Sequence, residues 1–511
     1  MDLIASFLLF LLSLIWASFH LLNSNSRHRR SAKLPPGPYP FPIIGSILQL
    51  GQNPHQKFTK LSKTYGPLIY LKLGSVDTIV VSSPEIAKEI LQTHDQAFPL
   101  RMNTAAVRAL DHHTTSVAFQ PMGSQWRNLR KICKEQMFST QPMYASQGLR
   151  QAKLQKLLQY VQECCVNGRA MDIGQAAFVT SLNLISNTLF SVDFADYNTG
   201  SSQELEETIH RLMRVFASPN LGDYFGFLGL FDPQGIKREA EFYMGKLLAI
   251  FDSIIDQRVE ASRNSQARKT DLLEVLLEIS ERNPAELTHK IMKHLLLIRK
   301  RRWSSPCIFA TAAQIDATTP LSRSGLRASP VLDLGDATLP KSEIEGADTT
   351  SVTVEWVMTE LLRNPHIMSK LKMEVRTVVG ANKQVEESDI SKLPYLQAVI
   401  KESLRYHPPG PFLMRRKDGN DLEIKNYVIP KNARSRFQRA RLRTDPVRAG
   451  RENVSGLPLA YRMIHLTVAS LIHNFDWELE AGITPRDVDL NEKFGLSLKK
   501  AIPLKAVPIK P

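Results

Sequence analysis

The chain has 511 residues, which is enough to bury a large core in one domain or in several. Hydrophobic residues make up 43% of it and charged residues 23%, the composition of an ordinary globular protein rather than a disordered or fibrous one. Its four cysteines, Cys133, Cys164, Cys165 and Cys307, exclude a disulfide framework and fit a reducing compartment.

The formal net charge of +15 is concentrated in two segments. Residues 298–344 contain seven Lys or Arg and four Asp or Glu, and residues 433–453 contain seven and two, so together they carry eight of the fifteen charges. A basic balance can indicate binding to nucleic acid or acidic lipid. Both segments are also anomalous in their sequence pattern, so the charge alone does not indicate such a partner.

An apolar segment runs from Leu3 to Leu22 and is about as long as a bilayer's hydrocarbon core is thick. Basic residues follow it at once, and such residues are retained on the cytosolic side. We expect a single-pass anchor in residues 1–26, a stiff, basic, proline-rich hinge in 27–42 and a cytosolic domain in 43–511. A cleaved signal peptide is the alternative, but its basic residues would precede the apolar segment.

The remaining pattern predicts a large, mainly helical domain with a small β portion. Two short strands, 68–73 and 78–82, are expected around a Gly-Ser turn, and strand-like residues return near 423–429. Helices are expected where apolar residues recur at helical spacing: 84–94, 123–138, 151–166, 203–216, 236–263 and 349–363.

Two helical segments carry residues that suggest chemistry. In the first, Trp126 is followed four residues later by Arg130, although a solvated basic face with one buried tryptophan gives the same pattern. In the second, Asp348 and Thr349 stand side by side near the start of an apolar helix, where an acid and a hydroxyl could relay protons. The same pair is also a common helix start.

A third motif lies in residues 393–411, L-P-Y-L-Q-A-V-I-K-E-S-L-R-Y-H-P-P-G-P. Glu402 and Arg405 are three residues apart, so they share one face of the predicted helix. Such pairs are common and weak on protein surfaces. Because the helix is apolar around them and ends at a double proline, we expect this pair to be partly buried, where it needs further partners.

Together these motifs resemble the plant microsomal cytochromes P450, which are haem-thiolate monooxygenases, and among them the terpenoid-hydroxylating group that includes geraniol hydroxylase. The likeness covers most of residues 1–297, 345–432 and 456–511. It implies the cytochrome P450 fold, haem b as cofactor, a small apolar, terpenoid-like substrate, and electrons from NADPH through NADPH-cytochrome P450 reductase. It also implies an endoplasmic reticulum membrane protein with a cytosolic catalytic domain and no nucleic acid partner.

The resemblance assigns roles to the polar motifs. It implies that Asp348 and Thr349 deliver protons to iron-bound oxygen, and that Glu402 and Arg405 lock the core beneath the haem. Glu345 departs from the family pattern, which has a small residue there. A carboxylate at that position would crowd or charge the oxygen pocket.

The resemblance also implies contacts to the haem itself. Trp126, Arg130 and Arg416 would meet its propionates, since a guanidinium pairs with a carboxylate in two bonds. The ligand loop of the family follows the pattern F-x-x-G-x-R-x-C-x-G, and Gly450 and Gly456 match its two glycines.

The cysteine of that loop is missing. Val447 stands in the Phe position, Glu452 in the Arg position and Val454 in the position of the cysteine, whose thiolate is the axial iron ligand of the family. Valine has no lone pair to give a metal. The cysteines of this chain do not substitute, since three lie on predicted helices as expected buried thiols and Cys307 lies in a segment without family match.

A shift of reading frame explains the altered loop. Residues 446–457, back-translated with synonymous codons chosen freely and read one base later, can encode P-F-G-x-G-x-(K/R)-M-C-P-G. That is the missing loop in register, and we infer that the gene encodes it. Residues 298–344 lack clear periodicity and are interpreted as intron read as protein, and residues 433–455 replace a longer family segment.

Three hypotheses fit these observations. The first is a monooxygenase that inserts one oxygen atom of O2 into an apolar substrate and whose gene sequence is misassembled. The second is a catalytically inactive, haem-free relative expressed as written, which Val454 favours. The third is a membrane-tethered protein that binds polyanions through the arginines of residues 434–443, although that run has one aromatic residue and no recognisable fold around it.

Overall fold

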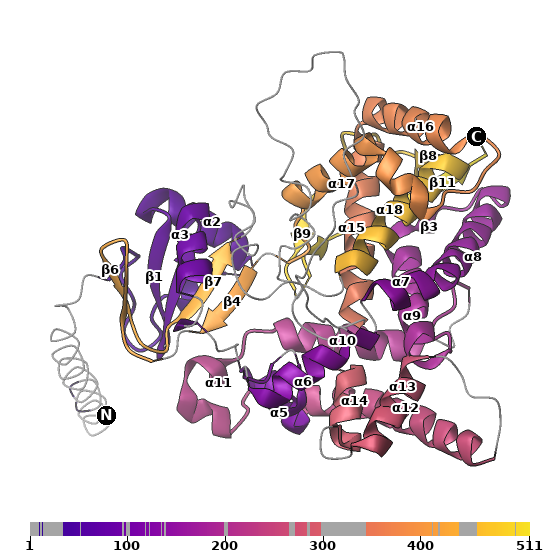
Figure 1. Cartoon of the computed structure of the whole chain (residues 1–511). Helices are drawn as coiled ribbons and strands as arrows, with labels where there is room; N and C mark the ends of the chain where they lie inside the picture. Colours follow the sequence, from indigo (N-terminus) through magenta and orange to yellow (C-terminus); the bar gives the residue numbers. More distant parts are fainter. Residues whose placement is uncertain are drawn as a thin grey trace, which may run out of the picture.

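The computed structural model describes residues 34–51, 53–94, 97–98, 103–117, 119–121, 123–133, 135–136, 139–198, 203–264, 271–283, 287–297, 344–410, 412–416, 419–438, 457–495 and 497–510, with Phe10 and Ser13. They form a β-rich part and a larger helical part, which lie side by side in Figure 1. No helix among these residues is both long and apolar enough to cross a membrane. The expected anchor falls almost wholly outside the described residues.

A four-stranded sheet with the strand order β1-β2-β7-β4 organises the β-rich part. β1 (Leu68–Leu73) and β2 (Val76–Val81) form an antiparallel hairpin. The hairpin turns at Gly74, whose φ of 59° favours glycine. β7 (Arg434–Gln438) runs parallel to β2 and antiparallel to β4 (Phe412–Arg416), so it is a central strand.

Both faces of this sheet are covered, because successive strand residues point to opposite sides. Ile69 and Leu71 pack with Phe58 of α2 (Pro54–Tyr65) on one face. Ile79 and Val81 lie in a second apolar cluster with residues of α3 (Pro84–Lys88) and the π-helical turn η3 (Glu89–Thr93) on the other.

A second, small hairpin joins β5 (Leu422–Ile424) to β6 (Tyr427–Ile429). Its two turn residues, Lys425 and Asn426, have φ of 50° and 64°, the backbone that a tight two-residue hairpin turn requires. This hairpin confirms the strand expected near 423–429 and divides it in two.

The helical part is built around α15 (Ile344–Arg363), which packs against α9 (Ile173–Phe190) and α18 (Leu457–Asn474). The remaining α-helices are α4 (Ala105–Arg108), α5 (His112–Thr115), α6 (Ser124–Cys133), α7 (Thr140–Ala145), α8 (Gln147–Val166), α10 (Gln203–Ala217), α11 (Leu221–Tyr224), α12 (Ile236–Arg263), α13 (Leu272–Arg282), α14 (His289–Leu297), α16 (Pro365–Val379) and α17 (Pro394–Tyr406). Short 3-10 helices are η2 (Ile47–Gln49), η5 (Ala109–Asp111), η8 (Gly226–Leu230) and η9 (Glu387–Lys392).

Two apolar clusters meet along α9 and α15. One contains residues of α6, α10, α12 and α14 together with Ala347 of α15. The other contains residues of α8, α16, α17 and α18 together with Val354 and Val357 of α15. Because α9 and α15 supply residues to both clusters, they are apolar around most of their circumference, as buried helices are.

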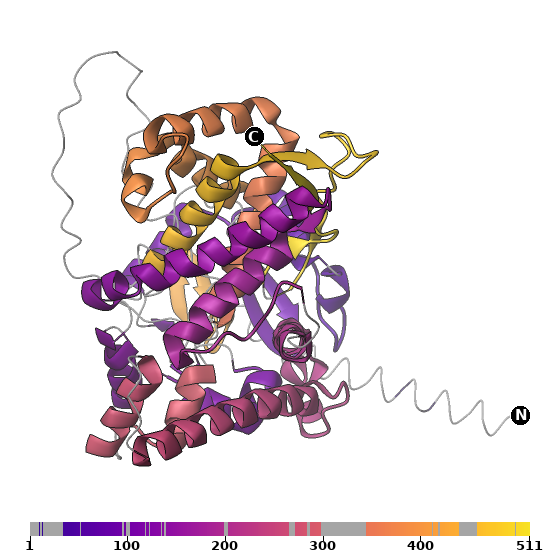
Figure 2. The ribbon, with the colours of Figure 1, turned by 90° about the vertical axis from the view of Figure 1, so that its right-hand side faces the viewer.

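Short strands near the C-terminus attach the end of the chain to this helical core. β11 (Lys505–Ile509) pairs with β3 (Met171–Asp172) and β8 (Asp476–Leu479). In Figure 2 the yellow strand β11 lies beside the purple ribbon of α8. β9 (Glu492–Lys493) and β10 (Lys499–Lys500) form a hairpin, which we call the C-terminal hairpin and define as residues 491–501.

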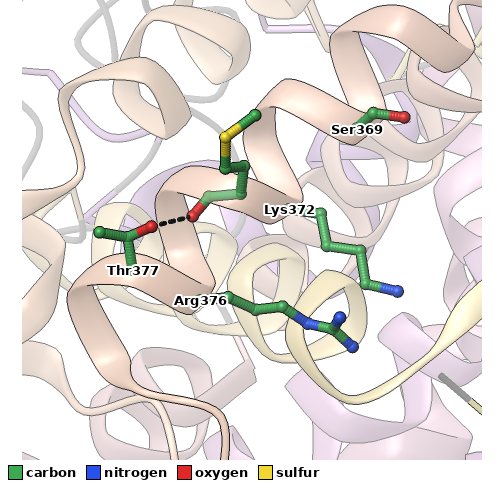
Figure 3. Close-up of a pocket in the computed structure, with 5 residues that line it drawn as sticks. Ser369, Lys372, Arg376 and Thr377 are labelled. Carbon is green, nitrogen blue, oxygen red and sulfur yellow. Dashed lines mark hydrogen bonds between the residues drawn. The ribbon is translucent and has the colours of Figure 1, made fainter.

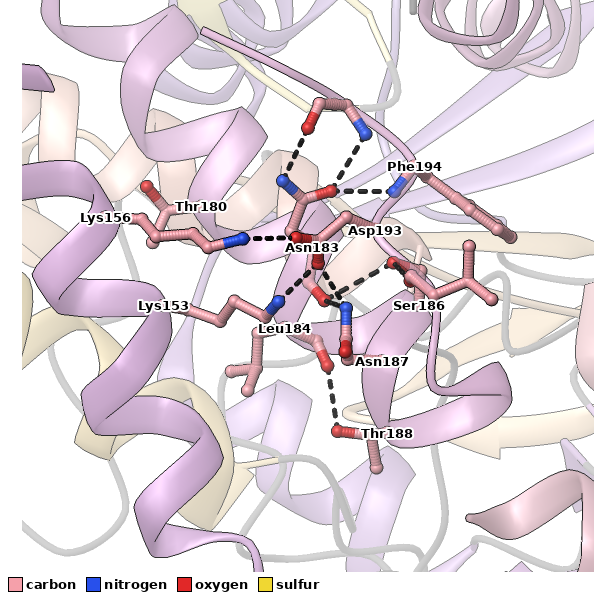
Figure 4. Close-up of polar contacts among 12 residues, drawn as sticks. Lys153, Lys156, Thr180, Asn183, Leu184, Ser186, Asn187, Thr188, Asp193 and Phe194 are labelled. Carbon is pink, nitrogen blue, oxygen red and sulfur yellow. Dashed lines mark hydrogen bonds and ion pairs between the residues drawn. The ribbon is translucent and has the colours of Figure 1, made fainter. Parts of the chain in front are cut away.

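Polar contacts fix the segment that follows α9, as Figure 4 shows. Asp193 accepts hydrogen bonds from Lys153 and Lys156 of α8. The side-chain oxygen of Asn183 accepts the backbone N–H groups of Phe194 and Ala195, both at 2.8 Å. These contacts satisfy backbone donors that would otherwise be buried without a partner.

Most of the predicted elements are confirmed. The predicted strand 68–73 and helix 236–263 coincide with β1 and α12, while α15 begins ahead of the predicted start at 349. α9 was not predicted as an element, because a helix that is apolar all round has little amphipathic period. Cys133 and Cys164 are buried as expected, but Cys165 is only partly buried because it lies beside the buried stripe of α8.

Candidate functional site

The acid and the hydroxyl predicted from the sequence lie inside the protein, in the first turns of α15. Asp348 and Thr349 are each 2% exposed, next to the fully buried Ala347. Ser351 donates to the backbone oxygen of Asp348, and Thr353 donates to that of Thr349, both at 2.8 Å. A buried polar stretch of this kind within an apolar helix needs partners from elsewhere in the fold.

Asp348 finds its partner in the C-terminal hairpin. The Nζ atom of Lys499 lies 2.5 Å from Oδ1 of Asp348. Burial alone would raise the pKa of Asp348, but the Lys499 ammonium outweighs it and lowers that pKa below its ordinary value. His210 of α10 faces the same charges, and burial together with the charge of Lys499 lowers its pKa to about 4. The sequence did not reveal Lys499 or His210, which are far from Asp348 along the chain.

The hairpin and the chain after it contact α15 at two further positions. Trp356 donates its indole N–H to the backbone oxygen of Leu498 at 3.2 Å. Glu355 accepts the backbone N–H of Leu504 at 2.9 Å. Gly174 makes room for this carboxylate, since a Cβ there would lie 2.8 Å from the Glu355 carboxyl carbon. Burial raises the pKa of Glu355 to about 7.

Trp126 and Arg130 of α6 lie in contact with each other. The Arg130 guanidinium carbon lies 4.5 Å from the centre of the Trp126 ring, and the indole donates to the backbone oxygen of Val117 at 2.9 Å. Leu129 between them belongs to the same apolar cluster as Ala347. The two predicted motifs are therefore joined through one part of the core.

Two buried histidines lie in the same cluster region and were not predicted. Nδ1 of His112 and Nδ1 of His294 are 3.3 Å apart, between α5 and α14. Burial lowers the pKa of His294 to about 4, so this histidine is neutral near neutral pH. The isolated positions of these two histidines in the sequence give no signal that they meet.

Glu402 and Arg405 are paired on one face of α17, as their spacing predicts. Two hydrogen bonds of 2.8 and 2.7 Å join them. The expectation of partial burial is wrong, since the two side chains are 60% and 55% exposed. The buried stripe of α17 instead contains Leu396, Ile400 and Leu404, on the opposite face of the helix.

The expectation that no recognisable fold surrounds the arginine run is also wrong in part. Residues 434–438 form the central strand β7, where Ser435 is fully buried and Arg436 is 8% exposed. Nε of Arg436 has no hydrogen-bond partner within the described part of the chain. Arg434 donates to the backbone oxygen of Asp223. These two arginines are therefore engaged inside the fold rather than displayed to a polyanion.

The other residues predicted to contact haem lie wholly or partly outside the described part of the chain. Arg416 ends β4, and its side chain lies outside the described part of the chain. Gly450, Gly456 and Val454 lie outside the described residues as well.

A hollow of about 460 Å³ lies against α16 and is lined by Ser369, Lys372, Met373, Arg376 and Thr377. Figure 3 shows Thr377 donating to the backbone oxygen of Met373. Lys372 forms an ion pair with Asp476. The hollow is lined by one helix and contains none of the predicted site residues, so we do not assign it a role.

The match to known proteins decides the family. The family model described as Cytochrome P450 matches residues 35–298 and 337–446, well over half of the chain. The chain belongs to the cytochrome P450 family. By family it is a monooxygenase, an oxidoreductase, and its mainly helical fold with small sheets is that of a cytochrome P450. The match omits residues 299–336 and ends before the predicted ligand loop.

Curated relatives are similar over nearly the whole chain. A protein named Cytochrome P450 76T24 from Catharanthus roseus is 42% identical, with 97% of each chain covered. Ferruginol synthase from Salvia miltiorrhiza is 42% identical, with 94% of this chain and 95% of the relative covered. Cytochrome P450 76AD1 from Beta vulgaris is 40% identical, with 98% of each chain covered.

Cytochromes P450 use a haem iron, and the residues of this chain do not fit such a centre at its ligand. The position of the thiolate is occupied by Val454. Within the described residues no group of three or more His, Cys, Asp or Glu side chains could hold a metal ion. Cys133 lies in an apolar cluster, and Cys164 accepts a contact of 3.3 Å from Arg169. We therefore derive no chemical step through the iron.

Proposed function

We propose that the gene behind this chain encodes a membrane-bound cytochrome P450 that inserts one oxygen atom of O2 into a small, terpenoid-like substrate. The electrons come from NADPH through NADPH-cytochrome P450 reductase, and the cofactor is haem b. The observation that carries the proposal is the buried Asp348–Thr349 pair at the start of α15, within the region that matches the family.

The surroundings of this pair support an apolar substrate. Ala347 lies in an apolar cluster with Phe119, Phe178 and Phe216. Such a cluster provides no charged partner for a polar substrate and favours a hydrocarbon by excluding water. Ferruginol synthase and Sugiol synthase from Salvia miltiorrhiza, 42% and 40% identical to this chain, support a terpenoid rather than another apolar compound.

Asp348 and Thr349 act in this proposal as a polar pair that supplies protons inside a dry site. Asp348 is held as a carboxylate by Lys499, whose side chain is 37% exposed and so connects the buried acid with solvent. The hydroxyl of Thr349 is the adjacent group that can both donate and accept a proton.

Attachment to the endoplasmic reticulum membrane is part of the proposal. Large apolar side chains are exposed near the beginning of the described chain, at Tyr39, Phe41, Ile43 and Leu48, and after α11, at Phe227, Leu230 and Phe231. The two groups are linked through the β1–β2 turn. Gly45 bridges to Leu73, and Ser75 donates its N–H to the backbone oxygen of Tyr224 at 2.9 Å. Exposed apolar residues that gather beside a predicted anchor fit a membrane surface.

The altered ligand loop belongs to the same proposal. The frame shift inferred for residues 446–457 restores a cysteine at the position of Val454. The family match ends at residue 446, where that shifted segment begins. We therefore propose that the active protein contains the restored loop and that the chain as written cannot turn over.

The experiment compares two full-length proteins in membranes with purified reductase and NADPH. One is the chain as written, and the other is the restored chain, which lacks residues 298–344 and contains the cysteine loop inferred above. Geraniol and a panel of diterpene hydrocarbons are the substrates, under an atmosphere of 18O2. We expect the restored chain to release products that carry one 18O atom, and the chain as written to release none.

Two further results decide between alternatives. If the restored chain binds haem but oxidises none of the terpenoids, the substrate class is wrong. If the transcript encodes Val454 and the chain accumulates without haem, the monooxygenase proposal fails and an inactive relative remains.

A further inference from the structure

A histidine at the end of α17 lies between two carboxylates from distant parts of the chain. His407 is 8% exposed. Its Nε2 atom lies 2.8 Å from Oε1 of Glu360 on α15, and its Nδ1 atom lies 3.7 Å from Oε1 of Glu492 in the C-terminal hairpin. An imidazolium can donate to both carboxylates at once, whereas a neutral imidazole can donate to only one.

The ring of His407 is also held by an aromatic neighbour. It lies parallel to the ring of Trp356 at an angle of 1°, with the ring centres 3.8 Å apart. Trp356 belongs to α15 and donates to the backbone of Leu498 in the hairpin. The face of an indole attracts a cation, so this stacking favours the charged form of His407.

Glu492 of the hairpin extends this series of contacts to α2. The other oxygen of Glu492 lies 3.1 Å from Nε2 of His55 on α2, and Phe494 stacks on the His55 ring at 5.7 Å. One line of charged and polar groups therefore joins α15, the end of α17, the hairpin and α2. Each of the three links spans at least 47 positions in the sequence.

The charges around His407 favour its protonated form. Burial opposes the charge, but the hydrogen bond to Glu360 and the nearby Glu492 carboxylate outweigh burial and raise the pKa of His407. Burial acts against the charge of Glu492 as well, yet His407 and His55 lower its pKa to about 2.

The other groups that face this cluster are few. Arg363 lies 3.4 Å from the second oxygen of Glu360. Lys500 lies 4.8 Å from the centre of the Trp356 ring, and the Tyr406 ring lies 6.0 Å from that of His407. Arg363 and Lys500 are therefore further cations beside the cluster, and His407 is the group that lies between the two carboxylates.

We propose that protonated His407 is a positioning residue that fastens the C-terminal hairpin to α15, so that Lys499 reaches Asp348. The Glu360–His407–Glu492 contacts, which we call the clasp, hold β9 of the hairpin, and Lys499 lies on the paired strand β10, next to the Lys500 that pairs with Glu492. The assignment of Asp348 as a proton-supplying residue rests on the proposed function, but the clasp itself does not.

The clasp is strongest in mildly acidic solution. The raised pKa of His407 stabilises the fastened state fully below the unfolded value of about 6.5, and this contribution is lost as pH rises through the folded pKa. The lowered pKa of Glu492 contributes above the unfolded value of about 4.3, and this part is lost only as pH falls towards 2. Both contributions are present together between about pH 4.5 and 6.5.

The test measures hydrogen exchange in the hairpin of the full-length chain, which requires neither haem nor turnover. The reporter amides are Leu498 and Ala501, which donate to Pro409 and Asn491 at 2.8 and 2.7 Å. The variants are His407→Phe, which keeps an aromatic ring on Trp356, and Glu492→Gln, which keeps the size of the side chain. The control is His473→Phe, another buried histidine, which contacts the backbone oxygen of Lys383 and whose pKa burial lowers.

At about pH 6 we expect both clasp variants to lower protection of the two reporter amides by roughly tenfold, the equilibrium change that corresponds to one pKa unit. At about pH 9 His407 of the unmodified chain should already be neutral, so the difference in amide protection between this chain and His407→Phe should disappear. His473→Phe should leave the reporter amides protected at both pH values. Acylation of Lys499 by an amine reagent should become several times faster in His407→Phe, while Lys505 in β11 should react at an unchanged rate.

The proposal is wrong if protection of Leu498 and Ala501 is the same with His407→Phe as without it, or if the loss is equal at both pH values. If His407→Phe unfolds the chain, Glu492→Gln decides, because it removes one charge and keeps the size of the side chain. The oxygenation experiment could fail while the hydrogen-exchange results agree with these expectations. The role of His407 in positioning the hairpin would then be supported, and only the proposed catalytic role of Asp348 would be rejected.

Discussion

Two buried cations of this protein have opposite surroundings. His407 lies between Glu360 and Glu492 and stacks on a tryptophan. Arg436, in the central strand β7, lies 6.0 Å from the Phe412 ring and donates only a long hydrogen bond of 3.5 Å to the Tyr224 hydroxyl, and its Nε atom has no partner among the described residues. A buried charge is tolerated when it is paired and hydrogen-bonded, and it destabilises the fold when it is not.

The difference between the surroundings of His407 and Arg436 indicates which segment of the chain suits the fold. His407 lies outside the anomalous segments, and its partners come from α15 and the C-terminal hairpin. β7 begins at Arg434, within the segment that the sequence pattern marks as anomalous. We infer that β7 carries foreign residues at positions where an apolar strand belongs, since β2 beside it is built of Ile79, Val80 and Val81.

The largest expected effect comes from removing the cation of the buried pair at the site. Lys499→Met leaves the Asp348 carboxylate buried without a cation, which should lower the free energy of unfolding by about 3 kcal/mol at neutral pH. The pKa of Asp348 is lowered in the folded protein, so this contribution is present above the unfolded value of about 3.9 and is lost as pH falls. Denaturation by urea at several pH values measures it, and Asp348→Asn in the same chain should recover most of the loss. An unchanged stability would mean that the pair is solvated.

The next effect concerns Glu355, the acid beside Gly174. Its pKa is raised to about 7, so its protonated form favours folding below the unfolded value of about 4.3, and this advantage is lost as pH rises through 7. Glu355→Gln removes this dependence. Its stability relative to the unmodified chain should rise by about 3 kcal/mol between pH 4 and pH 8. A difference that is flat over this range would show that Glu355 is ionised throughout.

A smaller effect of opposite sign is expected in β7. Arg436→Val should raise the free energy of unfolding by about 1–2 kcal/mol, because it replaces a buried cation, whose Nε has no described partner and whose Nη2 makes only a long hydrogen bond of 3.5 Å to the Tyr224 hydroxyl, by a residue that suits a central strand. The matched control is Arg434→Val, which loses the hydrogen bond to the Asp223 backbone and should not stabilise. Destabilisation by Arg436→Val would show that this arginine is paired and that the comparison drawn above is mistaken.

The smallest effect is expected at the ion pair of α17. Glu402→Gln should lower the free energy of unfolding by less than about 0.5 kcal/mol, because both partners are more than half exposed. Thermal unfolding at low and high salt measures it. A loss above about 2 kcal/mol would instead require burial of the pair in the complete protein.

The sequence was sufficient for features that depend on local spacing. The period of apolar residues predicted α12 to its ends, and the i, i+3 spacing paired Glu402 with Arg405. The family motifs pointed to Asp348 and Thr349, which proved to be buried.

Features that depend on long-range packing were not predictable in this way. Lys499 reaches Asp348, and Glu492 reaches His407, only because the C-terminal hairpin is laid along α15. Nothing in the local pattern of either segment specifies that meeting. The exposure of Glu402 could not be predicted either, because the apolar residues around it face the other side of α17.

The central claim is that this cytochrome P450 lacks its iron ligand through an error of reading frame, and the sequence of the transcript across codons 290 to 460 tests it most directly. We predict a continuous frame without residues 298–344, with apolar residues in place of β7 and with F-G-x-G-x-(R/K)-M-C-P-G in place of residues 447–456. A transcript that encodes Arg436 and Val454 as written would contradict the claim and would exclude catalysis by a thiolate-ligated iron in this protein.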